Sequence, residues 1–259
     1  MDSRPILVTG GTGTLGRAVV ARFLADGVPV RVMSRRARRA EDDRPYEWAV
    51  CDLADGTGLD DALADVRAVV HCATNSRNDV ATTRRLVEAA RRSGVPHVVY
   101  ISIVGIDRVP LPYYRAKLEA ERIIRESGLP CSILRTTQFH DLVATVVRVQ
   151  RRLPVVLTPR GVRCQPIEVT EVADRLVELA QGAPAGRVAD MAGPEVRDFR
   201  DLAEATLRAA GLRRRVVSVA LPGKIFRKMR AGGLLAPDRT VGTRTFEEYL
   251  AARARAGRS

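Results

Sequence analysis

The chain has 259 residues, of which 46% are apolar, and its 43 Lys and Arg against 30 Asp and Glu give a net charge of +13. This length and composition suit one large domain with a sizeable core and exclude a chain that is disordered throughout. No run approaches the roughly 18 consecutive apolar residues that span a bilayer. The amino terminus reaches a strand by Pro5, which leaves no room for a signal peptide, so we expect a cytoplasmic protein.

Strand-like and helix-like segments alternate from the first residues onward. The predicted strands are residues 5–9, 28–34, 46–52, 67–73, 97–103 and 131–135. The predicted helices between them are residues 14–26, 60–66, 78–93 and 113–127. Because these strands are apolar on both faces, they favour a parallel sheet with helices on both faces. Right-handed crossovers then predict an α/β fold with a doubly wound Rossmann sheet, in which strands 3-2-1 and 4-5-6 lie on either side of a switch point. A ligand crevice is expected at the carboxyl ends of strands one and four.

The pattern loosens after residue 136. Further predicted helices are residues 140–150, 171–181 (behind Thr170 as its cap), 199–210 and 244–256, and further strands are 154–158, 187–191 and 215–220. We expect a single domain of residues 1–259. Within it, residues 1–135 form the cofactor-binding core, and residues 136–259 complete the sheet and form a small cap on its substrate side.

Basic charge gathers near the carboxyl terminus, where residues 200–259 hold 14 Lys and Arg against 5 Asp and Glu. It is densest in RRR (213–215) and KIFRKMR (224–230). We favour a solvated basic face, and the alternative is attraction of an anionic substrate, a membrane surface or nucleic acid. Aromatic residues do not interleave with the arginines as a single-strand binder requires. We therefore expect neither a nucleic-acid nor a membrane partner.

The cysteines and histidines show no metal-ligand spacing. They are Cys51, Cys72, Cys131 and Cys164, which form no CxxC pair, and His71, His97 and His140. We expect reduced thiols, no structural disulfide and no metal site.

A glycine-rich loop, ILVTGGTGTLG at residues 6–16, joins the first strand to the first helix. It contains overlapping GxGxxG and TGxxGxxG spacings, which permit a tight turn, close approach of a pyrophosphate and close packing of the helix on the strand. The helix amino terminus then offers N–H groups to the phosphates. The residues expected to hold the cofactor here are Gly10, Thr12, Gly13, Thr14, Leu15 and Gly16. The alternative is a glycine-rich turn without a ligand.

The end of the second strand carries Ser34, Arg35 and Arg36, where an NAD-binding unit usually places an acid, and Glu41 is the first acid that follows. Two guanidiniums and a hydroxyl suit the 2′-phosphate of NADP because Arg binds phosphate through paired hydrogen bonds. We therefore expect NADP as the cofactor, with NADPH preferred over NADH. The alternative is that these are two more arginines in an arginine-rich chain.

These motifs resemble those of the short-chain dehydrogenase/reductase superfamily, above all its extended and atypical branch of NmrA-like and epimerase-like NAD(P)-binding proteins. The resemblance covers nearly the whole chain and rests on TGGTGTLG (9–16), CDL (51–53), HCAT (71–74), YISIVGI (100–106), YYRAK (113–117), ILRTTQFH (133–140) and QPIEVTEVAD (165–174). It implies that Asp52 and Leu53 flank the adenine. It also implies that Ala73 and Thr74 pass beneath the cofactor's ribose.

By the same resemblance, Tyr113 and Lys117 form the YxxxK pair of that superfamily. Positions i and i+4 share a helix face, and a nearby ammonium lowers the pKa of a tyrosine toward working pH. Tyr113 would then protonate a carbonyl oxygen as hydride arrives from the nicotinamide, while Lys117 hydrogen-bonds the ribose hydroxyls. The alternative is a packing tyrosine beside a snorkelling lysine.

Further residues are expected around the substrate. Ser102, at the end of the fifth strand, would orient the substrate oxygen, although it precedes Tyr113 by fewer residues than is usual in the superfamily. Tyr114 would form a wall of the pocket. Phe139 and His140, just past the sixth strand, would line the substrate side, with a structural hydrogen bond as the alternative for the histidine.

Three functions are compatible with these features. The first is an NADPH-dependent oxidoreductase that reduces a carbonyl or similarly polarised double bond in a small molecule. The second is an NmrA-like redox sensor that binds NADP without turnover. The third is an NAD-dependent epimerase or dehydratase, against which Arg35 and Arg36 argue. The YxxxK pair favours the oxidoreductase, because a sensor needs no tuned phenol. A homodimer through the helices at 78–93 and 113–127 is also expected as a possibility.

Overall fold

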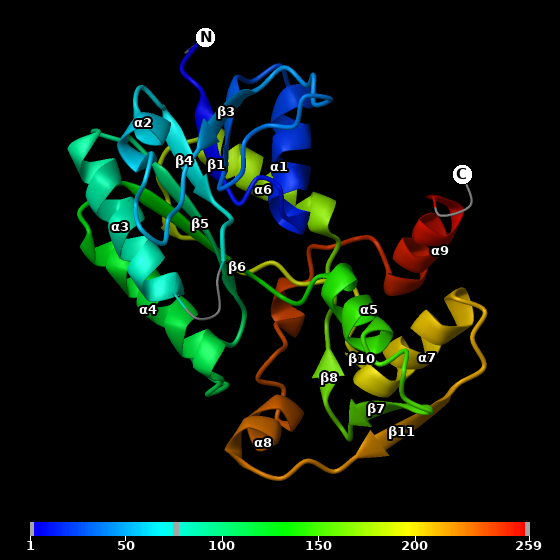
Figure 1. Ribbon diagram of the computed structural model, residues 1–259. Helices are drawn as coiled ribbons and strands as arrows, with labels where there is room; N and C mark the ends of the chain where they lie inside the picture. The colour runs from blue at the N-terminus through cyan, green and yellow to red at the C-terminus, as the bar shows by residue number, and fades with distance from the viewer. Residues whose placement is uncertain (1–2, 75–77, 257–259) are drawn as a thin grey trace. The chain divides into compact units, whose positions relative to one another are not determined.

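The computed structural model describes residues 3–74 and 78–256 (Figure 1). The chain divides into two compact units. The first comprises Met1–Ser102, Pro112–Leu134 and Val172–Val188, and the second comprises Ile103–Leu111, Arg135–Glu171 and Ala189–Ser259. Within the described parts, no helix is both long enough and apolar enough to cross a bilayer.

A seven-stranded parallel sheet forms the centre of the first unit, in the order β3-β2-β1-β4-β5-β6-β9. Its strands are β1 (Ile6–Thr9), β2 (Val30–Ser34), β3 (Glu47–Val50), β4 (Ala68–His71), β5 (Val98–Ile103), β6 (Cys131–Thr136) and β9 (Gly186–Arg187). All four residues of β1 and of β4 are buried, as expected for strands covered on both faces. The predicted fold class and the order of the first six strands are confirmed, and β9 adds a seventh strand beside β6.

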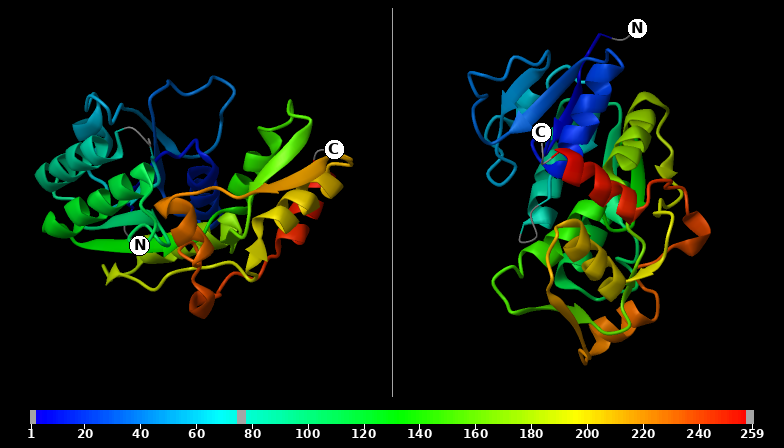
Figure 2. Two further views of the ribbon diagram at one scale, coloured as in Figure 1. Left: turned by 90° about the horizontal axis from the view of Figure 1, so that it is seen from below. Right: turned by 90° about the vertical axis from the view of Figure 1, so that its right-hand side faces the viewer.

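Helices cover both faces of this sheet (Figures 1 and 2). One face carries α2 (Leu59–Leu63), α3 (Asp79–Arg92) and α4 (Pro112–Glu126), and the other carries α1 (Thr14–Ala25) and α6 (Val169–Gln181). An ion pair of 3.4 Å between Arg22 and Asp174 links α1 to α6. Beneath α3 and α4, the core includes the fully buried side chains of Leu86, Ile124 and Ile133. The core therefore fixes α3 and α4 side by side, which matters for the site described below.

The second unit contains short elements around two small cores. Its helices are α5 (His140–Arg148), α7 (Phe199–Ala209), α8 (Lys224–Arg230) and α9 (Phe246–Ala256), with a 3₁₀ turn at Pro237–Arg239. Its strands pair as β7 (Val155–Pro159) with β11 (Arg215–Val219), in parallel, and as β8 (Arg163–Cys164) with β10 (Arg197–Asp198), antiparallel. One core joins α5, α7 and α9, and the other joins α7 to β7 and β11.

Several local predictions for the residues after 136 are wrong. Helix α6 begins at Val169, so Thr170 lies in its first turn and does not cap it. The strand predicted at 187–191 is reduced to Gly186–Arg187. Helix α8 and strands β8 and β10 were not predicted, because α8 buries none of its side chains and each of these strands has only two residues. Such elements show too little hydrophobic periodicity to be recognised from the sequence.

Candidate functional site

The carboxyl ends of β1 and β4 are tied together by a buried threonine. Thr9 lies opposite His71 in the parallel register, and its Oγ1 lies 2.7 Å from Nδ1 of that imidazole. The Thr9 oxygen also accepts a hydrogen bond of 3.1 Å from the Ala73 amide, which leaves the hydroxyl proton for His71. Complete burial, assisted by the charge of Lys117, lowers the pKa of His71 to about 3. The imidazole is therefore neutral, and the two loops that follow β1 and β4 are held at a fixed distance.

The loop after β1 and the first turn of α1, residues 10–16, form a turn that we call the glycine cradle. Its conformation is one that only glycine permits at two positions. Gly10 has a left-handed φ of +65°, and a Cβ there would lie 2.8 Å from the Cα of Ala73. A Cβ on Gly16 would lie 2.1 Å from the carbonyl oxygen of Gly10. Gly13 is the N-cap residue of helix α1, which has no side-chain cap and no acid in its first turn. Such a helix start offers N–H groups and the positive end of its dipole to an anion, so the residues fit a dinucleotide's pyrophosphate.

The predicted 2′-phosphate residues lie at the carboxyl end of β2. Arg35 and Arg36 are exposed, and neither guanidinium makes a hydrogen bond or ion pair with any residue in the described ranges. The Ser34 hydroxyl is not bonded to either guanidinium, since its Oγ accepts a hydrogen bond of 3.2 Å from the backbone N–H of Arg36. Arg31 differs, since it donates to Glu47 at 2.6 Å. Two guanidiniums are thus available to bind a phosphate beside the glycine-rich unit.

The residues expected beside the adenine form a turn after β3. Asp52 accepts the Ala54 amide through Oδ1 at 2.8 Å, and its carbonyl accepts the Gly56 amide at 2.8 Å. Leu53 is buried against the core. The turn is therefore rigid, which suits it to form the edge of a binding site.

Tyr113 begins a chain of polar contacts within the first unit. Its hydroxyl lies 2.9 Å from Oγ1 of Thr74, and Thr74 in turn donates to Oδ2 of Asp79 at 2.9 Å. Asp79 is the first residue of α3 and is only 3% exposed. The packing of α3 against α4 thus brings together residues that are 39 positions apart in the chain.

Lys117, one turn further along α4 than Tyr113, is the last member of this series of polar contacts. Its Nζ donates to the Tyr100 hydroxyl at 3.1 Å and lies 3.8 Å from Oδ2 of Asp79. The side chain is enclosed, with 3% of the residue exposed, and this burial lowers the pKa of Lys117. Tyr100 stacks on His71 with 5.4 Å between the ring centroids, so the network reaches from α4 to β4.

The electrostatics of Tyr113 differ from the expectation drawn from YxxxK. Burial raises the pKa of Tyr113, and the carboxylate of Asp79 adds to the rise. The expected lowering by Lys117 does not occur in this structure, because the ammonium is directed to Tyr100 and Asp79. Tyr113 therefore keeps its proton at neutral pH, which suits a proton donor better than a base.

The remaining expected substrate residues lie in different surroundings. Ser102 is 2% exposed, and its Oγ has no hydrogen-bond partner among the described residues. Tyr114 is buried beside Tyr113, with 6.3 Å between their ring centroids. Phe139 is partly buried at the start of α5.

His140 belongs to the core of the second unit. It is 1% exposed, stacks on Tyr249 at 5.3 Å and contacts Phe246 at 5.6 Å. Its Nε2 lies 3.1 Å from the carbonyl oxygen of Arg244. These contacts fit the structural alternative for this histidine, and they leave its ring enclosed by the unit's own residues.

Sequence reasoning missed three members of the site, namely His71, Asp79 and Tyr100. Asp79 offered one usable signal, since an acid in the first turn of a helix is favoured by the helix dipole. His71 and Tyr100 sit within apolar strands, where a buried polar side chain needs a partner. The sequence alone could not say which partner that was.

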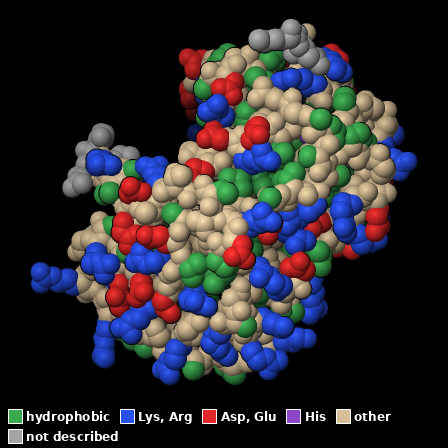
Figure 3. Space-filling view, turned by 180° about the vertical axis from the view of Figure 1, so that it is seen from behind, with side chains coloured by type: hydrophobic (Ala, Val, Ile, Leu, Met, Phe, Trp, Pro, Cys, Tyr) green, Lys and Arg blue, Asp and Glu red, His purple; other side chains and the backbone are tan. Residues whose placement is uncertain are grey.

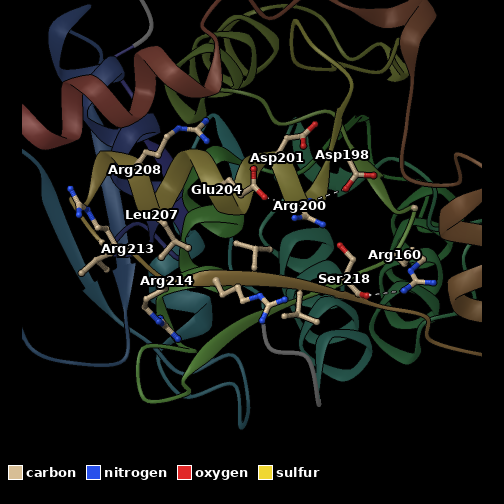
Figure 4. Close-up of a pocket in the computed structure, with 15 residues that line it drawn as sticks. Arg160, Asp198, Arg200, Asp201, Glu204, Leu207, Arg208, Arg213, Arg214 and Ser218 are labelled. Atoms are coloured by element: carbon tan, nitrogen blue, oxygen red, sulfur yellow. Dashed lines mark hydrogen bonds and ion pairs between the residues drawn. The ribbon is translucent and has the colours of Figure 1, made fainter.

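The basic segment at 213–215 lines an open hollow of about 900 Å³ on the second unit, between α7 and β11 (Figure 4). Arg214 is used structurally, because it donates to the carbonyl oxygens of Gln150 at 2.9 Å and Val155 at 3.2 Å. Arg200 is paired with Glu204 at 2.9 Å. Figure 4 shows Arg208, Arg213 and Arg214 pointing in different directions. The hollow therefore lacks the convergent donors that bind a phosphate group.

Basic and acidic side chains are interspersed on the face of the molecule seen in Figure 3. Exposed ion pairs of this kind include Arg122 with Glu119 and Glu126 on α4. Interspersed charge is typical of a solvated surface, and we retain that interpretation for the excess of arginine.

Comparison with known proteins gives a family model described as NAD(P)H-binding, which matches residues 10–182. A (4-alkanoyl-5-oxo-2,5-dihydrofuran-3-yl)methyl phosphate reductase of Streptomyces griseus subsp. griseus is 32% identical over 213 residues, which cover 80% of this chain and 74% of that protein. The photosystem II assembly factor Ycf39 of Trieres chinensis is 26% identical over 181 residues, which cover 65% of this chain. The match spans only 57% of the length of that assembly factor.

Solved structures with the same fold include an NADPH-dependent quinone oxidoreductase of Escherichia coli complexed with NADPH. It matches with a TM-score of 0.80 and 19% identity, over 96% of this chain and 99% of that chain. At this identity the likeness concerns the fold alone. Together with the family model, it confirms the NAD(P)-binding fold that the resemblance implied.

We expect Gly10→Ala to weaken NADPH binding at least about tenfold, while Gly94→Ala leaves the affinity unchanged. Both glycines have a left-handed φ, +65° and +62°, so both variants carry a similar backbone strain of about 1–2 kcal/mol. A Cβ at Gly94 would meet nothing within 4 Å, whereas at Gly10 it would displace the cradle from Ala73. Isothermal titration with NADPH measures the difference. Equal affinities in the two variants would show that the cradle does not hold the cofactor.

We expect the free energy of unfolding to fall as the pH drops below about 6.5. His71 has an ordinary pKa of 6.5 when unfolded and about 3 when folded, so the unfolded state binds more protons between these values. The stability contributed by neutral His71 is therefore complete above pH 6.5 and lost toward pH 3, at up to about 1.4 kcal/mol per pH unit. Urea unfolding at several pH values measures this slope. His71→Asn should flatten it, and parallel curves for the two proteins would contradict the assignment.

Proposed function

The chain belongs to the NAD(P)H-binding family, and on this premise we propose that it is an NADPH-dependent reductase of a carbonyl or similarly polarised double bond in a small molecule. The observation that carries the proposal is the Tyr113 hydroxyl, held by Thr74 in the same unit as the glycine cradle. The family has an oxidoreductase-type fold, and its relatives include reductases. The finer assignment of cofactor, acid and substrate is ours.

The cofactor would be held by the residues of the cradle and by the end of β2. Gly10, Gly13 and Gly16 leave room for the pyrophosphate at the start of α1, and Arg35 and Arg36 would pair with a 2′-phosphate. Ala73 and Thr74 would lie beneath the ribose, and Asp52 and Leu53 beside the adenine. The bound cofactor supplies the hydride in this class of reaction.

Tyr113 would supply the proton. A phenol whose pKa is raised by burial is fully protonated at neutral pH, and it can give its proton to an oxygen on which negative charge develops. Lys117 would act through its position rather than by lowering that pKa, since it holds Tyr100 and Asp79 in place. Tyr114, Phe139 and Ser102 remain candidates for contact with the substrate.

The substrate class is suggested by the Streptomyces griseus reductase, whose name describes an oxo-dihydrofuran ring that bears an alkanoyl group and a methyl phosphate. A small molecule with a ring carbonyl or a conjugated double bond and an apolar chain is therefore the first class to test. We also propose a cytoplasmic location, since all four cysteines are free thiols, as is usual in a reducing compartment.

A second function is favoured by one comparison. The similarity to a photosystem II assembly factor favours a protein that binds the cofactor and a partner without turnover. Both functions use the same cradle, so a binding assay alone does not separate them. Oxidation of NADPH in the presence of a panel of ketones, aldehydes, quinones and unsaturated lactones separates the two functions. A sensor would bind NADPH and leave the whole panel unreduced.

We expect the wild-type protein to bind NADPH at least about tenfold more tightly than NADH, and Arg35→Ala/Arg36→Ala to remove this preference. Each charge-assisted hydrogen bond to phosphate contributes about 1.5–3 kcal/mol, and NADH lacks the phosphate. Arg91→Ala is a matched control, because this exposed arginine lies on α3 in the same unit. Titrations of the three proteins with both nucleotides test the expectation. Equal affinity of the wild type for NADPH and NADH would refute the 2′-phosphate site.

We expect Tyr113→Phe to reduce turnover of a reducible substrate by about 10²–10⁴-fold, the usual contribution of a positioned acid. The affinity for NADPH should not change, because the phenol is not part of the cradle. Tyr249→Phe serves as the control, since its hydroxyl bonds Asp141 in the second unit. Full turnover by Tyr113→Phe would exclude the tyrosine as the acid.

A further inference from the structure

We propose that Thr74 and Asp79 are positioning residues that hold the Tyr113 hydroxyl and its proton. The chemical consequence of this arrangement rests on the proposed reductase function. The arrangement itself is a property of the free protein, and it can be measured without turnover.

The direction of the hydrogen bonds follows from counting protons. A threonine hydroxyl has one proton, and Thr74 donates it to Oδ2 of Asp79 at 2.9 Å. The oxygen of Thr74 is then only an acceptor toward Tyr113, 2.9 Å away. Tyr113 must therefore be the donor in this pair. Asp79 in this way sets the orientation of the phenol through Thr74.

Asp79 is fixed as an acceptor by its surroundings. It occupies the first turn of α3, where the partial positive charge of the helix amino terminus favours a carboxylate. The ammonium of Lys117 lies 3.8 Å from the same Oδ2 that receives the Thr74 proton. Both groups stabilise the negative charge on Asp79, and a carboxylate accepts hydrogen bonds without donating.

The other titratable groups that face this cluster do not replace Asp79. They are Tyr100 on β5, His71 on β4, Cys72 after β4 and Glu121 on α4. Burial raises the pKa of Tyr100 and of Cys72, the latter to about 12, so both stay neutral at neutral pH. His71 is neutral because burial lowers its pKa to about 3. Glu121 is buried on α4, two turns beyond Tyr113, and its charge acts on Lys117 and Tyr100.

Ser102 makes no hydrogen bond to the Tyr113 hydroxyl. Its Oγ is buried and has no hydrogen-bond partner in the described part of the chain, whereas Thr74 touches the Tyr113 hydroxyl. In the reductive direction, the O–H bond of Tyr113 breaks as the proton moves to the substrate oxygen, and solvent returns a proton to the phenolate. The proton given up is the one that Tyr113 shares with Thr74 in the free protein.

The test is the pKa of Tyr113, measured by carbon-13 NMR of protein labelled at the tyrosine ζ carbon. The chain has five tyrosines, and the Tyr113 signal is the one lost in Tyr113→Phe. We expect Asp79→Asn to lower the pKa of Tyr113 by about one unit or more. The variant removes a nearby negative charge. The amide that replaces the carboxylate also has an NH2 group that can donate to the Thr74 oxygen, so that the Thr74 proton is available to stabilise the phenolate. Glu88→Gln is the control, because it removes an exposed charge from the same helix and should leave the pKa of Tyr113 unchanged.

Asp79→Asn leaves the Lys117 ammonium buried without its carboxylate, which can prevent folding. The comparison of Lys117→Met with Lys117→Met/Asp79→Asn avoids an unpaired buried cation. The carboxylate that remains in Lys117→Met keeps the Thr74 hydroxyl and the amino terminus of α3 as its partners. The same downward shift is expected between these two proteins. Adding Thr74→Val should reduce the shift, since one of its two causes needs the threonine hydroxyl, and Thr74→Ser should restore it.

An unchanged pKa of Tyr113 on loss of Asp79 would overturn the inference, as would a shift that Thr74→Val does not reduce. Either result would leave the proposed reductase function in place, because that function is tested by the turnover of Tyr113→Phe and by the substrate panel. Conversely, a panel without turnover would defeat the reductase and leave the measured shift in place. For an active enzyme, Thr74→Val should lower kcat, and Thr74→Ser should restore it.

Discussion

The buried ammonium of Lys117 is the group on which the arrangement of the site depends. Removing a charged amine from water costs several kcal/mol unless hydrogen bonds and an opposite charge replace the lost hydration. Here the Tyr100 hydroxyl and the Asp79 carboxylate supply that replacement, from β5 and from the first turn of α3. Because both partners are themselves buried, α3, α4 and β5 can adopt only the alignment that brings these three groups together.

This constraint extends to the cradle. Tyr100 stacks on His71, and His71 is bonded to Thr9 at the end of β1, which leads directly into the glycine loop. Thr9 also binds the amide of Ala73, against which Gly10 packs without room for a Cβ. The cofactor loop and Tyr113 are therefore connected through a continuous set of hydrogen bonds, ring stacking and close packing within one unit. The hydrogen bonds among the buried members satisfy groups that would otherwise be left unpaired in the core.

The comparisons with known proteins concern the cofactor-binding fold. The family model matches residues 10–182, which include the glycine cradle, and the solved structures share the fold. A reductase and an assembly factor both appear among the relatives, so similarity at this level does not separate catalysis from binding. In the function that we propose, Tyr113 and its partners on α3, on α4 and in the loop after β4 make that difference.

The sequence by itself determined the doubly wound sheet, the glycine loop and the pair of arginines after β2. Those features depend on local periodicity and on short motifs, which act through the backbone of a few adjacent residues. The sequence also placed Tyr113 and Lys117 on one helix face, but not the direction of the lysine, whose long side chain reaches several neighbours. Only the tertiary structure decided that Lys117 turns to Tyr100 and Asp79, and that Thr74 contacts the hydroxyl of Tyr113. These contacts form because buried polar groups need hydrogen-bond partners. Residues that are far apart in the sequence become such partners only when the sheet and its helices pack together.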